Sequence, residues 1–595
     1  MENRAMTQSI LPTHPLDGLQ LTRLQQAVEG LNSEQLIWAS GYLAGLGAVQ
    51  PAIGEAANEA PLLTILYATH GGNARGVAEA LADGARAWGL APRLVAAEGY
   101  RARDLTKERL LVVVISTQGE GEPPEGAFEL FRYLKGNKAP QLDGLKYAVF
   151  GLGDSSYEHF CQAAKELDAL LQGCGAQALL QRIDADVDFQ RQSTAWQGEV
   201  LRAVEQLQPS DQARIIPLQR GTTAGIRYDR NHPFQSELLE RRRITTTDAL
   251  SEVHHLALEI DPQAISYRPG DALGVLFRND PALVEEILSH TRLSGDTRVK
   301  LGDDELTLTQ ALIERLELTQ LHPRLVKAWA ALSGDRELSA LSEDGEGLRR
   351  FVQGLQLIDL LQAYPVELDG QGVVNLLHPR QPRLYSIASS QAAYEDEVHL
   401  AVSTLRYRGH GREHLGGASG YLTRRLVAGE RLGVYVAENN GFRLPQSGDT
   451  PIIMVGAGTG IAPYRAFLQA REAAGAGGDG WLIYGNRHFH RDFLYQADWL
   501  NYRKAGLLKR ISLAFSRDGK ERTYVQARLY EERAELYRWL RQGAHLYVCG
   551  GVAMEQGVRQ ALQAIAQDQG GLDEAAAIEY IESLREQGRY QRDVY

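Results

Sequence analysis

Two loops rich in glycine and hydroxyl side chains have the residue types that bind a phosphorylated ligand with a flat ring. The first loop contains Thr69, His70, Gly71, Gly72, Asn73 and Ala74, and it stands between an apolar run and an alanine-rich helical pattern. Backbone N–H groups at such a turn, together with the positive end of the following helix, make a phosphate site. The second loop begins with Ser116, Thr117, Gln118 and Gly119 and ends on Pro123-Pro124. Its hydroxyls and glycines can approach a flat ring, and the prolines fix its shape.

A third loop adds an aromatic side chain that is suited to stacking on such a ring. It follows Gly151 and consists of Leu152, Gly153, Asp154, Ser155, Ser156, Tyr157, Glu158, His159, Phe160 and Cys161. The three loops follow three apolar runs, Leu62–Ala68, Leu110–Ile115 and Tyr147–Phe150, and helical patterns separate them. This alternation predicts a doubly wound parallel sheet, in which ligands bind beyond the carboxyl ends of the strands.

The three loops, in this order, resemble the flavodoxin family over about Leu62–Gln206. The resemblance implies an FMN site, with Thr69–Ala74 around the phosphate and the other two loops on the ring. One position departs from the family pattern, because Gly71 stands where a hydroxyl residue usually precedes the Gly-Asn pair. A glycine N–H can replace that hydroxyl as a phosphate donor.

The second half of the chain carries three further groups of residues with chemical potential. Gly416, Gly417, Ala418 and Ser419 form a second phosphate cradle at the start of an apparent helix. A glycine-rich turn, Gly456–Pro463, follows the strand-like run Ile452–Val455 and includes Gly458, Thr459 and Gly460. After another strand come side chains suited to an adenosine 2′-phosphate, which would select NADPH over NADH: Ser516, Arg517, Lys520, Arg522, Tyr524 and Gln526.

This half resembles the ferredoxin–NADP reductase family, which implies FAD and NADP. In the family motif Arg383-Leu384-Tyr385-Ser386, the resemblance places Arg383 at the pyrophosphate, Tyr385 on the ring and Ser386 near the flavin N5. It assigns Arg406 and Tyr407 to the adenine side and adds Thr319 by position, although a surface threonine is the simpler explanation there.

The same resemblance implies a hydride-transfer centre and a cover for it. Ser386, Cys549 and Asp593 would surround the nicotinamide C4 and the flavin N5, and Tyr595 would cover the flavin face until nicotinamide displaces it. The segment after Cys549, Gly551-Val552-Ala553, is one residue shorter than in the family and lacks its acidic residue. Contacts to the nicotinamide-side ribose are therefore not predicted.

We expect a multidomain α/β protein with three folded parts. A helical segment and connector span 1–61, and a flavodoxin-like doubly wound parallel sheet spans 62–206. After a linker at 207–227, an FAD-binding antiparallel β-barrel spans 228–447, with a helical insertion at about 280–365. A parallel-sheet NADP-binding domain spans 448–595. The N-terminal pattern Leu19–Leu46 fits either an assembly element or a helical extension packed on its own chain, and Gln50–Pro61 reads as its connector.

Composition restricts the function classes. A net charge of -12 disfavours nucleic acid, and three cysteines are too few for a disulfide framework or a structural zinc site, so we expect no resident metal. No run approaches the roughly 18–20 apolar residues of a membrane-spanning helix. Met1–Pro15 lacks the features of a signal peptide, and we expect a cytoplasmic protein with no membrane partner.

An FMN part followed by an FAD/NADP part resembles the diflavin reductases over nearly the whole chain. The N-terminal segment and the ending Arg589–Tyr595 most resemble the flavoprotein (α) subunits of bacterial assimilatory sulfite reductases. That resemblance implies NADPH as donor, a sirohaem/iron–sulfur hemoprotein (β) subunit as partner, and a flavoprotein homo-oligomer. The alternatives are a soluble reductase for a P450, a flavodoxin or another haem protein, and a scaffold that has lost a cofactor. The acidic stretches Glu120–Glu125 and Asp184–Asp188 are candidates for a docking surface or ordinary solvated loops.

Overall fold

The structure is a computed structural model, and it describes residues 63–69, 71–118, 121–136, 139–207, 228–302 and 304–595. The predicted N-terminal helical segment, its connector and all but the first residue of the linker at 207–227 lie outside the described residues. So do two predicted site residues, His70 and Gly119.

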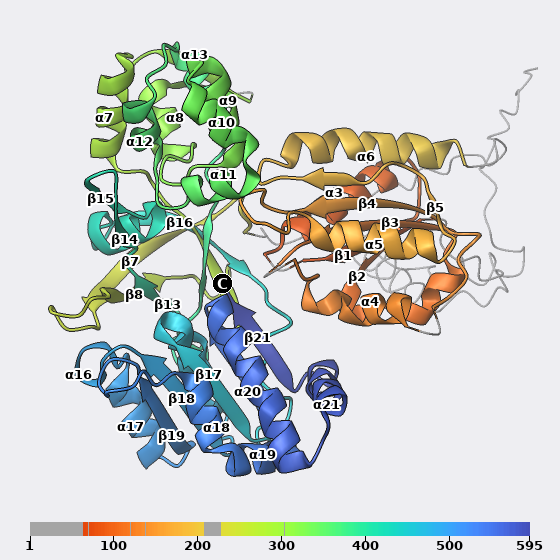
Figure 1. The fold of residues 1–595 in the computed structure, drawn as a ribbon, viewed down its shortest axis with the longest axis vertical. Helices are drawn as coiled ribbons and strands as arrows, with labels where there is room; N and C mark the ends of the chain where they lie inside the picture. Colours follow the sequence, from red (N-terminus) through yellow and green to blue (C-terminus); the bar gives the residue numbers. More distant parts are fainter. Residues whose placement is uncertain (1–62, 70, 119–120, 137–138, 208–227, 303) are drawn as a thin grey trace, which may run out of the picture. The chain divides into compact units, whose positions relative to one another are not determined.

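The first sheet is parallel and lies in the order β2-β1-β3-β4-β5, with β6 also pairing with β4 (Figure 1). Its strands are β1 (Thr64–Ala68), β2 (Arg93–Ala96), β3 (Leu110–Ser116), β4 (Lys146–Leu152), β5 (Gln177–Ala178) and β6 (Ile183–Ala185). This order has a switch point between β1 and β3, the place where flavodoxin-like sheets bind ligand. The predicted doubly wound sheet is confirmed.

Helices cover both faces of this sheet, which explains why its central strands are apolar throughout. The helices are α3 (Asn73–Ala87), α4 (Phe128–Lys135), α5 (Gln162–Gly173) and α6 (Gln190–Glu205), joined by the short helices η1 (Ala97–Gly99), η2 (Ala102–Lys107) and η3 (Glu125–Ala127). One core joins α3 and α6 to one set of strand side chains, and a second core joins α4 and α5 to the alternate set.

The second sheet is antiparallel, in the order β12-β9-β16-β7-β8-β13. Its strands are β7 (Phe234–Arg243), β8 (Val253–Glu259), β9 (Ala272–Leu276), β12 (Arg383–Ser386), β13 (Glu397–Ser403) and β16 (Arg431–Ala437). A bridge between Ile387 and Leu400 joins the two ends of this order, so the sheet closes into the predicted barrel. A separate hairpin pairs β14 (Arg406–Gly409) with β15 (Arg412–Leu415), and α14 (Gly417–Gly420) and the π-helix η4 (Tyr421–Arg425) follow.

Between β9 and β12 the chain forms a helical insertion with its own core. The insertion contains α7 (Pro281–Thr291), α8 (Leu308–Glu314), α9 (Pro323–Ser333), α10 (Arg336–Glu343), α11 (Gly345–Val352), α12 (Leu357–Ala363) and α13 (Gly370–Leu376). It also holds a hairpin of β10 (Arg298–Leu301) and β11 (Asp304–Thr307). All buried members of its core lie between Val284 and Leu377, and the helices continue beyond the predicted end near residue 365.

The third sheet is parallel, in the order β19-β18-β17-β20-β21. Its strands are β17 (Ile452–Ala457), β18 (Gly480–Asn486), β19 (Leu508–Phe515), β20 (His545–Gly550) and β21 (Tyr590–Val594). Its helices are η5 (Gly458–Ile461), α15 (Ala462–Ala473), α16 (Phe489–Asp492), α17 (Gln496–Lys504), α18 (Val525–Glu531), α19 (Arg533–Arg541), α20 (Val552–Gly570) and α21 (Glu574–Glu586). The predicted parallel-sheet domain is confirmed, and its last strand ends one residue before Tyr595.

No helix in the described part of the chain combines the length and the apolar content needed to cross a membrane.

Candidate functional site

The three loops of the first sheet follow β1, β3 and β4, and hydrogen bonds hold these neighbouring strand ends together. The Ser116 hydroxyl donates to the Ala68 carbonyl over 3.4 Å. The Thr117 amide donates to the Leu152 carbonyl over 3.0 Å, and the Thr117 hydroxyl accepts from the Ala163 amide over 3.3 Å. The structure therefore brings the predicted loop residues to one edge of one sheet.

The first loop leaves the start of α3 open to an anion. Gly72 has a φ of +84°, which favours glycine, and its amide donates to the Thr69 hydroxyl over 2.9 Å. Among the described residues, no side chain caps α3 and no acidic residue stands in its first turn. The first N–H groups and the helix dipole can therefore meet a phosphate, and the loop fits the group expected there.

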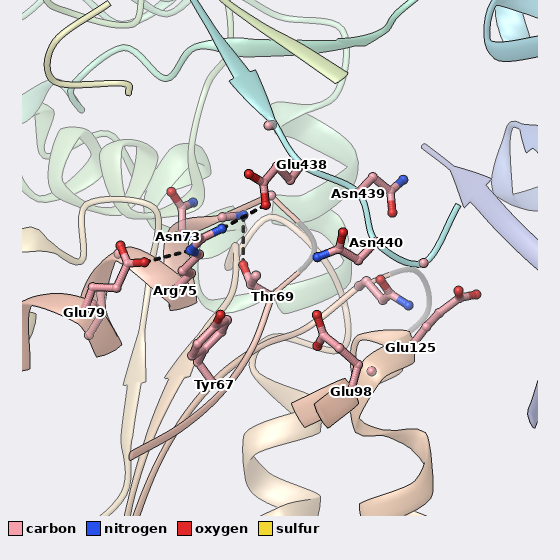
Figure 2. A pocket seen from close by; sticks show the side chains of 18 of the residues that line it. Tyr67, Thr69, Asn73, Arg75, Glu79, Glu98, Glu125, Glu438, Asn439 and Asn440 are labelled. Atoms are coloured by element: carbon pink, nitrogen blue, oxygen red, sulfur yellow. Dashed lines mark hydrogen bonds and ion pairs between the residues drawn. The ribbon is translucent and has the colours of Figure 1, made fainter. Parts of the chain in front are cut away.

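A cavity of about 750 Å³ opens beside this loop, and Figure 2 shows its lining. Thr69 and Asn73 border it from the first loop, and Glu438 and Asn439 from the segment after β16. Arg75 in the first turn of α3 pairs with Glu79 at 2.8 Å and with Glu438 at 3.2 Å, as Figure 2 shows. Arg75 adds positive charge next to the predicted phosphate position.

Loops two and three pack directly against each other. A Cβ on Gly121, which has a φ of +99°, would lie 2.7 Å from the His159 Cβ. A Cβ on Gly153 would lie 2.9 Å from the Cys161 Sγ, and Cys161 itself begins α5 in a left-handed conformation. Tyr157 is 64% exposed, as a ring that stacks on a ligand would be before the ligand binds.

His322, which sequence reasoning missed, joins the third loop to the helical insertion. It caps α9, and its Nε2 lies 3.6 Å from Asp154 Oδ1 and 3.3 Å from Asp186 Oδ1. Nε2 also lies 3.3 Å from the Ser155 hydroxyl. Burial alone would lower the pKa of His322, but the hydrogen bonds and charges of Asp154 and Asp186 raise it to about 9. The His378 ring, 4.4 Å away, has a lowered pKa because it is buried beside His322.

We expect this contact to weaken as the pH rises. Because the pKa of His322 is raised, its stabilisation is complete below the unfolded value of 6.5 and is lost as the pH passes about 9. Replacing His322→Asn keeps a capping side chain and removes the charge. At pH 6 the free energy of unfolding of the variant should be lower than that of wild type by up to about 3 kcal/mol, measured as a lower unfolding temperature. The difference should shrink toward pH 9.5. A difference independent of pH would contradict this assignment.

A larger cavity, of about 970 Å³, lies between the barrel and the third sheet. Leu384, Tyr385 and Ser386 of β12 line one side, and Arg406 and Arg424 lie farther along. Its size is in the range of cofactor sites. Arg406 and Tyr407 begin β14.

Seven of the predicted flavin residues do not line this cavity: Arg383, Tyr407, Thr319, Gly416, Gly417, Ala418 and Ser419. Arg383 donates to the Gln320 side chain over 2.6 Å. The Tyr407 hydroxyl accepts from Gln356 over 3.2 Å, and its ring packs 5.2 Å from the His414 ring. Their roles toward a cofactor remain predictions.

In the second glycine cradle, neither Gly416 nor Gly417 has room for a side chain. A Cβ on Gly417 would lie 2.6 Å from the Phe277 ring and 2.8 Å from the Thr319 hydroxyl. A Cβ on Gly416 would lie 2.8 Å from the Ser419 hydroxyl. Only glycine therefore fits at these two positions. Thr319 lies beside the cradle, and its role toward a cofactor remains a prediction. The Thr319 hydroxyl donates to Glu317 over 2.7 Å.

Replacing Gly417→Ala should lower FAD retention by about ten-fold or more, because the buried Phe277 ring cannot move away from the added methyl group. FAD and FMN released from the purified chain, separated and measured by fluorescence, would show FAD lost and FMN kept. Gly173→Ala is the matched control, because nothing lies within 4 Å of a Cβ at that position. Full FAD content in Gly417→Ala would refute the cradle.

Three predicted catalytic side chains meet at the end of the larger cavity, where Ser386 and Asp593 line it and Cys549 is buried behind Asp593. The Ser386 hydroxyl donates to Asp593 Oδ2 over 2.7 Å, and the Cys549 thiol lies 3.7 Å from the same oxygen. Burial raises the pKa of the Cys549 thiol, and the Asp593 charge raises it further. Asn439, which sequence reasoning did not single out, donates to Asp593 Oδ1 over 3.4 Å. The group thus joins β12, β20 and β21.

Tyr595 stands at the open side of this cavity with 63% of its surface exposed. Its hydroxyl lies 3.1 Å from the Thr459 hydroxyl, and its amide donates to the Gly550 carbonyl over 3.1 Å. Thr459 belongs to the glycine-rich turn after β17, where Gly458 has a φ of +57°. A Cβ on Gly460 would lie 2.2 Å from the Cys549 carbonyl oxygen, so this turn can approach β20 only as glycine.

The predicted 2′-phosphate residues from Ser516 to Tyr524 lie between β19 and α18, and Gln526 is the second residue of α18. Backbone hydrogen bonds from Ser516 to Asn486 and from Arg517 to Arg487, each 2.9 Å, hold the turn against the end of β18. Arg517, Lys520 and Arg522 are exposed, and no acidic partner is found for them in the described ranges. Tyr524 is 46% exposed. The turn therefore presents cations and hydroxyls to solvent, as a phosphate site requires.

Gln526, in the first turn of α18, has an unsatisfied hydrogen-bond acceptor. Its side-chain oxygen is buried, and no described group donates a hydrogen bond to it. A buried acceptor without a donor is costly, and the role of Gln526 toward a nucleotide remains a prediction.

Comparisons with known proteins give three domain matches along the chain. A flavodoxin model matches residues 65–198, an FAD-binding domain model matches 226–421, and an oxidoreductase NAD-binding domain model matches 454–560. Each range covers most of one of the three sheets, and β16 and β21 lie beyond the matched residues.

Whole-length relatives are also found. The chain is 46% identical to the sulfite reductase (NADPH) flavoprotein alpha-component of Shewanella oneidensis, over 98% of both chains. It is 44% identical to the protein of that name from Yersinia pestis and 43% identical to the one from Serratia proteamaculans, over 100% of all chains concerned.

Proposed function

The chain belongs to the family of NADPH-dependent sulfite reductase flavoprotein alpha-components, and on this premise we propose that it passes electrons from NADPH through FAD and FMN to a sulfite-reducing partner subunit. The observation that carries the proposal is the meeting of Ser386 and Asp593 beside Tyr595 in one cavity, with the buried Cys549 thiol in contact with Asp593 behind them. When bound, NADPH supplies two electrons as a hydride, FAD accepts them as a pair, and FMN releases them singly.

The residues at the end of the cavity orient and stabilise the reacting groups. The hydrogen bond between Ser386 and Asp593 fixes both side chains where a ring from the barrel side and a ring from the third sheet would meet. A carboxylate there stabilises the positive charge that a nicotinamide ring gains as it gives up a hydride. Because its pKa is raised, Cys549 stays a neutral thiol that donates toward Asp593 and excludes water from that side.

Tyr595 controls access to the open side of the cavity. Its ring is largely exposed, and its hydroxyl is 3.1 Å from that of Thr459, on the glycine-rich turn of the predicted NADP-binding domain. A ligand that binds this turn therefore competes for Thr459 and frees the ring to move. Displacement of an aromatic cover by substrate is a gating step of a common kind.

Replacing Arg517→Ala should raise the KM for NADPH by about ten- to a hundred-fold and change the KM for NADH little, because charge-assisted hydrogen bonds to phosphate are worth about 1.5–3 kcal/mol. Steady-state reduction of ferricyanide with each nucleotide measures both constants. Arg503→Ala is the matched control, because Arg503 is an exposed cation at the end of α17, next to the opposite end of β19. Equal losses with NADPH and NADH would contradict a 2′-phosphate role.

We further propose a sirohaem/iron–sulfur hemoprotein (β) subunit as the partner, a homo-oligomer of the flavoprotein, and a cytoplasmic location. The name of the relatives, which calls them alpha-components, supports a second component. The one-electron exit through FMN suits a haem or iron–sulfur acceptor. Supply of NADPH, a cytoplasmic reductant, suits the location.

Mixing the purified chain with a sirohaem subunit tests this function. We expect sulfide to form from sulfite and NADPH only when both subunits are present, with about one FAD and one FMN per chain. Asp593→Asn should keep both flavins and slow sulfide formation and NADPH–ferricyanide reduction together. Cytochrome c reduction without sulfide would retain the diflavin chemistry and exclude sulfite reductase. A chain without flavin would exclude both and leave a binding scaffold.

A further inference from the structure

Arg592 of β21 lies between the first sheet, which is expected to bind FMN, and the helices of the third sheet, which is expected to bind NADPH. Its guanidinium is 4% exposed and contacts three carboxylates, one on each nitrogen. NH1 donates to Glu555 over 3.0 Å, NH2 donates to Glu122 over 3.0 Å, and Nε donates to Glu125 over 3.2 Å. The Tyr590 hydroxyl donates to the same Glu555 oxygen over 3.1 Å.

The three carboxylates come from different parts of the fold. Glu555 is on α20, the helix that follows β20, so this pair stays within the third sheet and its helices. Glu122 belongs to the second loop of the first sheet, one of the loops expected on the FMN ring, and Glu125 begins η3 directly after that loop. Figure 2 shows Glu125 beside the cavity that the first loop also lines.

The pKa values of Glu122 and Glu125 depend on the positive charge of Arg592. Burial raises the pKa of Glu125, although Arg592 opposes the rise. Burial would also raise the pKa of Glu122, but Arg592 and neighbouring arginines hold it below its usual value. Arg592 in turn is buried, and without Glu122 and Glu125 only Glu555 would balance its charge. A buried guanidinium with fewer partners shifts or admits water rather than remain in place.

Arg592 is directly joined to Asp593 on β21. Successive side chains of a strand point to opposite faces, so Arg592 reaches toward the second loop while Asp593 reaches toward Ser386. Two residues further on, the Tyr595 amide is hydrogen-bonded to Gly550. A displacement of Arg592 along or across β21 therefore moves the carboxylate at the hydride-transfer position and the aromatic cover together.

We propose that Arg592 is a positioning residue through which the second loop, docked by Glu122 and Glu125, sets the geometry of Asp593 and Tyr595. The inference rests on the proposed function. Arg592 couples the FMN-binding part, which releases electrons, to the FAD- and NADPH-binding part, which receives them. Hydride transfer is therefore fastest while the second loop is docked. When the loop leaves to meet an acceptor, β21 relaxes and hydride transfer slows.

The test uses the full chain with Glu122→Gln and Glu125→Gln together. Neither side chain lines the larger cavity, and the exchange keeps their size while removing their charges. We expect NADPH–ferricyanide turnover, which draws on FAD, to fall about three- to ten-fold. The primary isotope effect with NADPH deuterated at the transferred position should rise, because hydride transfer becomes slower relative to the other steps. FMN content is measured in each preparation.

Glu129→Gln is the matched control, since Glu129 is an exposed carboxylate at the start of α4, four residues after Glu125. It should leave both readouts at wild-type values. Arg592→Lys, which keeps the charge but not the three-way contact, should change both readouts in the same direction as the double variant.

Unchanged ferricyanide turnover and isotope effect in the double variant would overturn the inference, even if cytochrome c reduction fell. That pattern would mean that Glu122 and Glu125 serve only the FMN side. Failure of the proposed function has a different signature, because wild type itself would then reduce neither acceptor with NADPH.

Discussion

The hydrogen bond between Ser386 and Asp593 joins the barrel to the third sheet at the larger cavity, beside other contacts such as that of Asn439 with Asp593. Ser386 ends a barrel strand, and Asp593 lies on the last strand of the third sheet. The 2.7 Å contact requires β12 and β21 to end at the same place, and the cavity, the position of Cys549 and the place of Tyr595 all depend on this. Parallel pairing of β20 with β21 meets half of the requirement, since it sets Cys549 opposite Asp593. Closure of the barrel by Ile387 and Leu400, next to Ser386, meets the other half.

Structural features that depend on local residue patterns could be predicted from the sequence. Features that depend on contacts between residues far apart in the chain could not. Apolar runs predict β1, β3 and β17 as parallel strands, because a strand buried on both faces needs apolar residues throughout. The glycine turns after them predict phosphate loops, because a phosphate needs accessible backbone N–H groups. β21 is different. Its sequence, Tyr-Gln-Arg-Asp-Val, has no apolar run, since only alternate side chains of this edge strand are buried.

The same reasoning explains the residues that the sequence left unnoticed. His322 lies more than a hundred residues along the chain from Asp154 and Asp186, and Arg592 is as remote from Glu122 and Glu125. An isolated histidine or arginine carries no pattern. The acidic stretches predicted as docking surface are also paired within the chain: Asp186 with His322, Asp188 with Arg324, and Glu122 and Glu125 with Arg592. An external partner that uses these acids must therefore replace an internal cation rather than find a free anion.

The helical insertion also has a consequence for how the molecule forms. β9 and β12 are neighbours in the barrel, yet residues 277–382 separate them in the chain. Closing so long a loop is entropically costly. Because the insertion has a core of its own, it can fold first and bring the two ends of the loop, and so β9 and β12, closer together. Barrel closure, and with it the assembly of the Ser386 strand, then becomes a late event in folding. The ability to retain flavin would consequently appear only after most secondary structure has formed.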